Sequence, residues 1–148
     1  MVEVIFTIVL LGVLATFATM KLLTPATMTL PAQAQSLADV IRRAQSLAVV
    51  RGERTRVSVT TSGVNGSVAV ACPASTPCNT DTGLTVSQGA VLQGASVYFN
   101  SLGQPVDSAG TALTGDTTFT LSYTTGTSPA TYRVTVAPLT GRVSVLNP

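Results

Sequence analysis

The sequence predicts an α+β protein in which a long N-terminal hydrophobic helix is packed on an antiparallel β-sheet head. Three patterns predict this: an uncharged apolar run near the N-terminus, a helical periodicity over residues 36–52, and an alternation of period two from residue 54 onward. A length of 148 residues suits one domain with an appended segment. We therefore divide the chain into a hydrophobic segment, residues 1–31, and a globular head, residues 32–148.

The apolar run is the first element. Val4–Met20 contains no charged residue, and Lys21 closes it. Seventeen helical residues span about 25 Å, and counting from Met1 gives about 30 Å, enough to cross the hydrocarbon core of a bilayer. A signal peptide fits less well, because no basic segment precedes the run and no small-residue cleavage pattern follows it. A buried core helix fits poorly at the very end of a small β-rich chain. We therefore expect a transmembrane helix.

Glu3 is unusual in such a segment. A carboxylate costs about 2.5–3.5 kcal/mol at the bilayer centre and less near the interface. Two interpretations stay open. Glu3 either pairs with a cation, from its own α-amino group or from another chain, or it lies at headgroup level, where a helix N-terminus favours an acid.

The second helix is expected over residues 36–52, because Pro25 and Pro31 disfavour a continuous helix before it. Ser36 is a suitable N-cap and Gly52 a suitable stop. The helix has one apolar stripe and must pack against the sheet that follows. The stripe comprises Leu37, Val40, Ile41, Ala44, Leu47 and Ala48.

Antiparallel strands are predicted across residues 54–148. Apolar and polar residues alternate around Val57, and Asn65-Gly66 marks a hairpin turn into Val68–Ala71. The full set amounts to five to seven strands in one sheet. The later candidates are Ala95–Asn100, Thr117–Thr124, Thr131–Ala137 and Arg142–Leu146.

The composition argues against catalysis. No histidine is present, which excludes Ser-His-Asp and Cys-His nucleophile systems and imidazole metal sites. The six acidic residues are never closer than nine positions, so no local carboxylate cluster exists, although a pair assembled by folding stays open. We predict no enzyme, no metal and no cofactor. Charged residues make up 9%, against about 25% in typical domains, and Ser and Thr replace them. Such a surface suits packing beside copies of the same chain, or life outside the cell.

Cys72 and Cys78 enclose a short loop containing two prolines. Two cysteines without histidine or nearby acids do not complete a zinc site, so we predict a disulfide and an oxidising compartment. A ring this small contributes on the order of 2 kcal/mol.

Five of the eight basic residues fall in one short stretch. One interpretation is a basic patch for DNA or anionic lipid. The other is a solvated surface, balanced by Asp39 and Glu53 or by acids of neighbouring subunits. The net charge of +2 is small, and no aromatic residue interrupts the stretch for stacking on single strands. DNA binding is therefore the lesser alternative. The five residues are Arg42, Arg43, Arg51, Arg54 and Arg56.

The N-terminal segment Met1–Ala15 resembles that of type IV pilins and of the pseudopilins of type II secretion. The resemblance rests on an apolar helix with one glutamate near its start and a glycine nine residues later, here Glu3 and Gly12. More narrowly, the second helix and the final strands resemble the GspH/FimT-like branch. Those strands are Tyr132–Val136 and Gly141–Val145.

The resemblance implies a structural role. Such chains are made as prepilins with a short basic leader, which is removed before the new terminus is methylated. They are stored in the bacterial inner membrane, and assembly machinery extrudes them into a helical filament of copies, as an extracellular pilus or periplasmic pseudopilus. Glu3 matches the glutamate that pairs with a neighbour's N-terminal amine, and Gly12 matches the glycine near which the helix loosens. The family's helix-breaking proline comes sooner after the glycine than Pro25 does here, so a loosened segment is expected near Gly12–Pro25.

The sequence also departs from the family pattern. The family's glutamate is usually the fifth residue and here is the third, and Cys72–Cys78 lies mid-chain rather than near the C-terminus. Some FimT-like minor pilins bind DNA through basic residues after a C-terminal Gly-Arg. Gly141-Arg142 keeps one arginine there, so Arg142 joins the alternative DNA-binding set.

Overall fold

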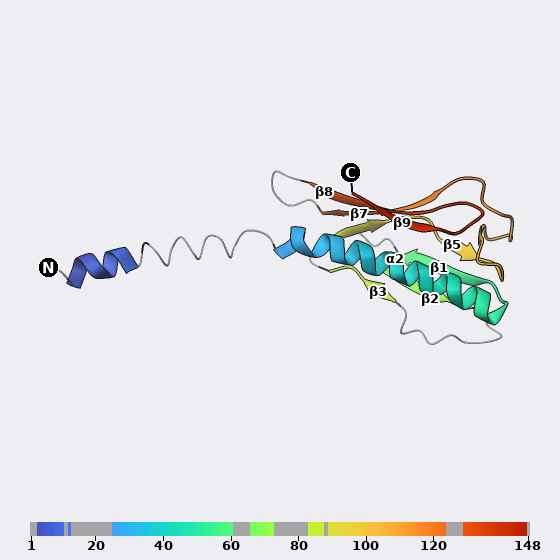
Figure 1. Ribbon diagram of the computed structural model, residues 1–148, viewed down its shortest axis with the longest axis horizontal. Helices are drawn as coiled ribbons and strands as arrows, with labels where there is room; N and C mark the ends of the chain where they lie inside the picture. The colour runs from blue at the N-terminus through green and yellow to red at the C-terminus, as the bar shows by residue number, and fades with distance from the viewer. Residues whose placement is uncertain are drawn as a thin grey trace.

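The computed structural model describes residues 3–10, 12, 25–60, 66–72, 83–87, 89–123 and 129–147. Residues 3–10 are helical, and the head consists of one helix, α2, with two antiparallel sheets (Figure 1). The helix lies along both sheets and contacts strands of each. This arrangement confirms the predicted α+β class.

Helix α2 spans Pro25–Arg51 and buries one face. The predicted apolar stripe is confirmed, since four of its six residues are fully buried and Val40 and Leu47 pack partly buried against the core. The stripe extends further toward the N-terminus than predicted, to Leu30. Its alanines let the helix approach the sheets closely. The fully buried helix residues are Leu30, Ala34, Leu37, Ala38, Ile41, Ala44 and Ala48.

The predicted start of this helix at Ser36 is wrong, because α2 begins at Pro25 and contains Pro31. A proline fits the first helical position, where its missing N–H has no partner anyway. Pro31 removes one helical hydrogen bond, but Leu30 beside it is buried, and tertiary packing outweighs local propensity. Ser36 is no cap, since its hydroxyl donates to the Ala32 carbonyl within the helix. The predicted end is confirmed: Gly52 has φ +65° and donates to the Val49 carbonyl.

The strands form two sheets rather than the single sheet predicted. The described residues give nine strands, against the five to seven expected, because two- and three-residue strands are too short to show a periodicity. One sheet has the order β3 (Leu84–Thr85), β2 (Ser67–Ala71), β1 (Thr55–Thr60), β5 (Val97–Phe99), β6 (Pro105–Val106). The other has the order β4 (Val91–Gln93), β7 (Thr117–Tyr123), β8 (Ala130–Val136), β9 (Val143–Leu146).

The core lies between the two sheets and α2. Its largest buried side chains are Phe99 of β5 and Phe119 of β7, one from each sheet. The predicted pairing of these two strands is confirmed, since Thr60 lies opposite Ser67. The predicted Asn65-Gly66 turn falls within residues 61–66, of which 61–65 lie outside the described residues. Along β1, Val57 is buried and Arg56 exposed, so the alternation sets an inner and an outer face of the first sheet.

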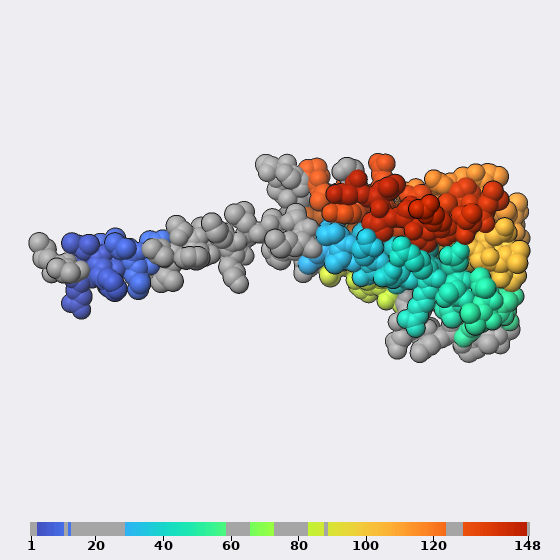
Figure 2. Space-filling view, in the orientation of Figure 1, coloured from blue at the N-terminus to red at the C-terminus, as the bar shows by residue number. Residues whose placement is uncertain are grey.

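The N-terminal segment stands apart from the head in the space-filling view (Figure 2). Within the described residues, no helix combines the length and apolar character that a bilayer crossing requires. Residues 4–10 and 12 of the predicted transmembrane helix are described and helical, and the rest of it lies outside the described residues. Residues 25–31 of the predicted hydrophobic segment belong to α2.

Candidate functional site

The helical residues 3–10 present an apolar surface with no partner in the described chain. Six large apolar side chains are between 51% and 67% exposed, a degree typical of an interaction surface rather than of a free monomer. The Thr7 hydroxyl donates to the Val4 carbonyl at 2.9 Å, so the polar atom of this residue is satisfied within the helix. The exposed set comprises Val4, Ile5, Phe6, Ile8, Val9 and Leu10.

The predicted assembly residues lie along this part of the chain. Glu3 is exposed at the start of the helical segment, and Gly12 has open space where a Cβ would stand. Pro25 opens α2. The amine in the predicted pairing belongs to a neighbouring copy, so that pairing stays a prediction.

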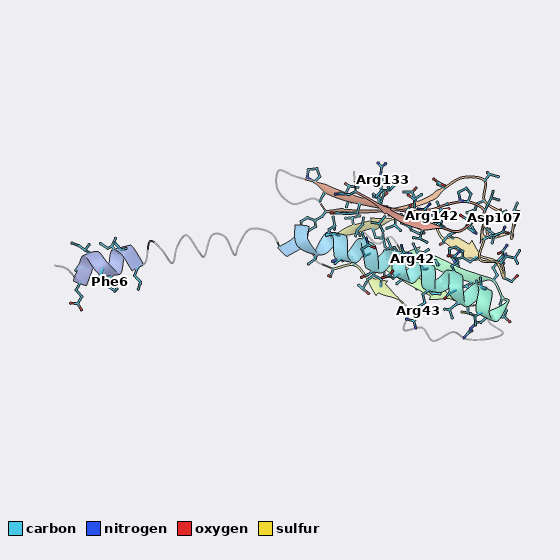
Figure 3. All side chains as sticks on the ribbon, viewed as in Figure 1. Phe6, Arg42, Arg43, Asp107, Arg133 and Arg142 are labelled. Atoms are coloured by element: carbon cyan, nitrogen blue, oxygen red, sulfur yellow. The ribbon has the colours of Figure 1, made fainter. Side chains whose placement is uncertain are left out.

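The arginines of the basic stretch do not form one surface. Arg42 and Arg43 are exposed on α2 (Figure 3), whereas Arg54 and Arg56 are exposed at the outer face of the first sheet. A helix places side chains with a period of 3.6 residues and a strand with a period of two. Arginines that are close in the sequence therefore lie on different sides of the head. Arg51 is exposed at the end of α2.

Arg42 forms polar contacts at the edge of the second sheet. It forms an ion pair of 2.7 Å with Asp39 and donates to the Val143 carbonyl at 3.3 Å. Val143 begins β9, the edge strand of the sheet, and a guanidinium on its outward carbonyl helps to protect that edge from unwanted pairing. Arg142, directly before β9, is exposed.

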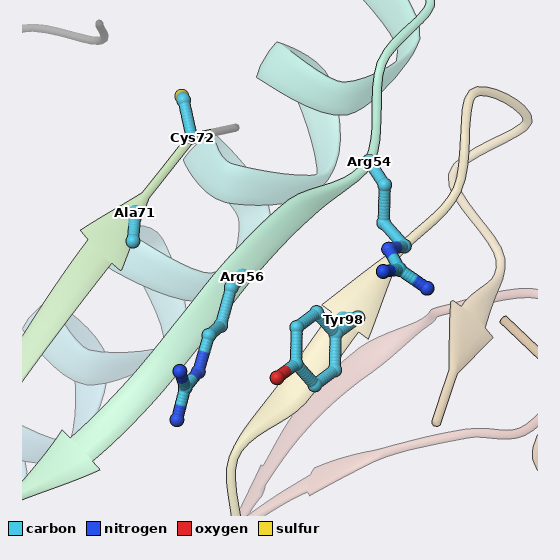
Figure 4. A pocket seen from close by; sticks show the side chains of 5 residues that line it. All are labelled: Arg54, Arg56, Ala71, Cys72 and Tyr98. Carbon is cyan, nitrogen blue, oxygen red and sulfur yellow. The ribbon is translucent and has the colours of Figure 1, made fainter. Parts of the chain in front are cut away.

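Arg54 and Arg56 share one aromatic partner, Tyr98. The pairing of β1 with β5 sets Arg56 opposite Tyr98, and the guanidinium carbons of Arg54 and Arg56 lie 5.2 and 5.5 Å from the centre of its ring (Figure 4). Both distances fall in the cation–π range. We call these three residues the Arg–Tyr cluster. It lines a hollow of about 270 Å³ together with Ala71 and Cys72.

Hydrogen bonds hold both arginines of the cluster. Arg54 Nη1 donates to the Ser108 carbonyl at 3.0 Å, and Arg56 Nη2 contacts the Ser96 hydroxyl at 3.4 Å. Within the described part of the chain, neither guanidinium has a carboxylate at ion-pair distance. Their remaining N–H groups can therefore donate to an oxyanion from another molecule. The residues described include no group of three His, Cys, Asp or Glu side chains that could hold a metal ion.

Sequence reasoning missed Tyr98. The basic stretch contains no aromatic residue of its own, but the sheet brings one to it from β5. Val97 and Phe99 are buried, so the alternation of period two turns Tyr98 outward. That alternation is visible in the sequence, whereas the pairing with β1 is not.

Cys72 follows β2 and lines the same hollow. Cys78 lies outside the described residues. The predicted closure of this loop by a Cys72–Cys78 disulfide stays a prediction.

Comparison with solved structures identifies the class of this fold. The type IV minor pilin FimU of Pseudomonas aeruginosa matches in two crystal forms, with TM-scores of 0.61 and 0.59 at 12% and 14% sequence identity. These alignments cover 81% and 79% of this chain and 90% and 92% of FimU. The minor pseudopilin EpsH of the Vibrio cholerae type 2 secretion system matches with a TM-score of 0.58 at 19% identity, over 80% of this chain and 97% of EpsH.

The chain thus has the fold of the minor pilins and minor pseudopilins of type IV pili and type 2 secretion. The predicted resemblance is confirmed at the level of the fold. No protein-family model and no curated protein sequence matches the chain.

Proposed function

We propose that this chain is a structural subunit of a type IV pilus or pseudopilus-like helical filament, and that it is not an enzyme. The observation that carries the proposal is the exposed apolar helix of residues 3–10, joined to a head of the minor pilin and pseudopilin fold. In this role the apolar helices of many copies pack together, with Glu3 as the charged group among them. Before assembly the chain is held in the bacterial inner membrane; afterwards it is in an extracellular pilus or a periplasmic pseudopilus.

The proposed latch is a pairing of Glu3 with the N-terminal amine of a neighbouring copy. Moving an apolar helix from lipid to a filament core gains no hydrophobic free energy, so packing and specific polar contacts must favour the assembled state. An unpaired carboxylate in a dry core is strongly unfavourable, and its pairing fixes the axial register of adjacent copies. The pilus or secretion machinery supplies the work of extraction.

Several finer features belong to the same proposal. The chain is processed from a prepilin and methylated at its new N-terminus. Gly12 lies where the helix loosens in the filament, with Pro25 beyond it at the start of α2. The Cys72–Cys78 disulfide forms once the head is in an oxidising compartment.

The test compares Glu3→Ala and Glu3→Gln with the unchanged full chain in cells that assemble it. Removing one partner of a buried charge pair costs about 3–5 kcal/mol, so we expect filament yield to fall by more than about tenfold. Electron microscopy and the amount of protein in the sheared filament fraction measure the yield. Thr7→Ala, on the same helix, is the control and should assemble normally. Normal filament yield from both Glu3 variants would overturn the latch.

DNA binding by a minor pilin or tip subunit is the second candidate, and it has less support. The proposed basic residues are distributed over separate surfaces, and of these six arginines only Arg54 and Arg56 contact the same ring, that of Tyr98. Two phosphate contacts give a salt dependence with a slope of about −1.8 on duplex DNA, which is weak for a DNA-binding protein. The candidate predicts retention of the chain on duplex DNA that weakens as salt rises.

A further inference from the structure

Exposed apolar side chains of the described head gather where two turns meet α2. Five large apolar residues of the described head are exposed, and four of them lie in the last turn of α2 or on these two turns. Leu102, between β5 and β6, is 76% exposed, and Leu139, between β8 and β9, is 62% exposed. Single exposed apolar residues are ordinary, but a group of them indicates contact with another molecule. We call Val49, Leu102 and Leu139 the two-turn patch.

One side chain of α2 joins the two turns. The Gln45 amide donates to the Gly103 carbonyl at 2.8 Å and to the Thr140 carbonyl at 3.2 Å. A Cβ on Gly103 would stand 3.0 Å from Cγ2 of Val49, so the first turn lies directly against the apolar part of the helix. The two leucines are far apart in the sequence, but a single residue of the helix holds their turns together.

The turn that carries Leu102 is also fixed by a side chain. Oδ1 of Asn100 accepts the backbone N–H groups of Leu102 and Gln104 at 3.0 and 2.9 Å. The Gly103 N–H donates to the Asn100 carbonyl at 2.9 Å. Fixing a turn in advance lowers the conformational entropy that binding would cost. Leu102 is therefore exposed on a turn that is already ordered for binding.

Leu139 has a backbone conformation that leucine seldom adopts. Its φ is +64°, the one positive value among the non-glycine residues that the structure describes, and the Thr140 N–H donates to the Pro138 carbonyl across it at 2.7 Å. This hydrogen bond around a residue of positive φ is the pattern of a γ-turn of the rare and strained form. Glycine would adopt the same φ without strain. A strained and exposed leucine is unfavourable for the head alone, which indicates a role outside the stability of the head.

Residues 3–10 provide a surface of matching chemistry. Their six large apolar side chains are exposed, and at about 100° per residue these side chains are distributed around the whole helix. A helix that is apolar on every side requires cover on every side. In the proposed filament, helices of other copies cover some of these sides, and the apolar patch of a head can cover another.

We propose that the two-turn patch binds the helix of residues 3–10 of a second copy of the chain. The inference rests on the proposed filament function and adds to it a contact between a head and the helix of another copy. Three side chains are few beside the about 20–30 residues that each partner contributes to a stable interface, so the contact requires a neighbour that is already held close. A filament provides that neighbour. Because the two surfaces differ, the contact is heterologous and can continue from copy to copy in an open helical array.

Photo-crosslinking in the full chain tests the contact. The photoreactive residue p-benzoylphenylalanine replaces Leu102 or, in a second variant, Val50, which is 82% exposed beside the patch, and assembled filaments are irradiated. We expect crosslinked multimers, with mass spectrometry locating the crosslink in residues 3–10 of the other copy. The same replacement of Leu146, an exposed leucine on β9, is the matched control and should give no crosslink to residues 3–10. Filaments in which both patch variants give no crosslink, or a crosslink to another segment, would overturn the contact and leave the filament function intact.

Removal of the strained leucine provides the second measurement. Leu139→Gly removes the apolar side chain and relieves the strain of the positive φ, so chemical denaturation should show a head at least as stable as before. The crosslinked fraction should nevertheless fall about fivefold, which corresponds to about 1 kcal/mol of lost apolar contact. Leu146→Ser is the control and should leave the crosslinked fraction unchanged. A crosslinked fraction unchanged by Leu139→Gly would overturn the role of the patch.

The two proposals fail in different ways. Crosslinks to residues 3–10 in detergent extract, from a chain that never forms filaments, would support the contact and contradict the filament function. A chain that gives neither filaments nor crosslinks would overturn both.

Discussion

Two glycines with the same backbone conformation differ in their surroundings. Gly52 has φ +65° and Gly141 has φ +66°, in the left-handed region that other residues adopt at a cost. A Cβ on Gly52 would have nothing within 4 Å. A Cβ on Gly141 would stand 2.5 Å from both the Gly103 carbonyl oxygen and the Gln45 amide nitrogen. The first glycine is needed for its φ alone, and the second also for the close approach of two turns to α2.

Alanine substitutions at these two positions should therefore distinguish the cost of a left-handed φ from the cost of steric overlap with neighbouring atoms. Gly52→Ala should lower the free energy of unfolding by about 1 kcal/mol, the cost of a left-handed residue. Gly141→Ala should lose a further 1–3 kcal/mol, approximately, because the added methyl group displaces backbone and not only a flexible side chain. Chemical denaturation of the full chain in detergent measures both. Equal losses would show that the turns can move apart without cost.

Gln45 shows why single-residue contacts of this kind escape sequence analysis. Its side-chain amide donates to the Gly103 carbonyl at 2.8 Å and the Thr140 carbonyl at 3.2 Å, linking α2 to one turn from each sheet. Gly52 was predictable, because a helix stop follows from local pattern. The role of Gln45 depends on two loops far along the chain, which only the tertiary structure brings together.

The elements that were predicted correctly are the long ones with a clear period. The apolar stripe of α2 and the alternation in β1 follow directly from side-chain spacing. The predicted start of α2 was wrong because Pro25 and Pro31 disfavour a helix when the sequence is considered alone. In the folded head, burial of Leu30 stabilises these first turns, and the sequence does not show that burial. The division into two sheets and the pairing that brings Tyr98 to Arg56 depend on strand order, which local patterns do not encode.

The position of Pro31 inside α2 gives a prediction at this scale. Pro31→Ala restores the hydrogen bond to the carbonyl four residues earlier, and should stabilise the first turns of the helix by up to about 3 kcal/mol. Because helix ends open locally, the global free energy of unfolding should change much less. Amide hydrogen exchange over residues 28–34 measures the local effect. Pro25→Ala is the matched control, since a residue at the first helical position gains no such bond, and equal protection in both variants would contradict the prediction.

The described part of the molecule divides into a head with its own core and a helical stretch, residues 3–10, whose side chains lie outside that core. The buried cluster begins at Leu30, whereas the side chains of residues 3–10 are exposed. The packing of the head therefore does not account for the apolar side chains of residues 3–10. This division explains a mean hydropathy of +0.45 in a chain whose head has an ordinary two-sheet core.

A pair of shortened chains tests this division and the corrected helix boundary together. A chain beginning at Pro25 keeps the whole described core, so it should be monomeric without detergent, with a Tm within about 2 °C of that of the full chain in detergent. A chain beginning at Ser36, the predicted helix start, lacks the buried Leu30 and Ala34 and should lose about 2–4 kcal/mol of stability. Thermal melting followed by circular dichroism and light scattering measures both properties. Equal Tm values for the two shortened chains would mean that the first turns of α2 add nothing to the head, and aggregation of the longer one would mean that the head requires its apolar segment to fold.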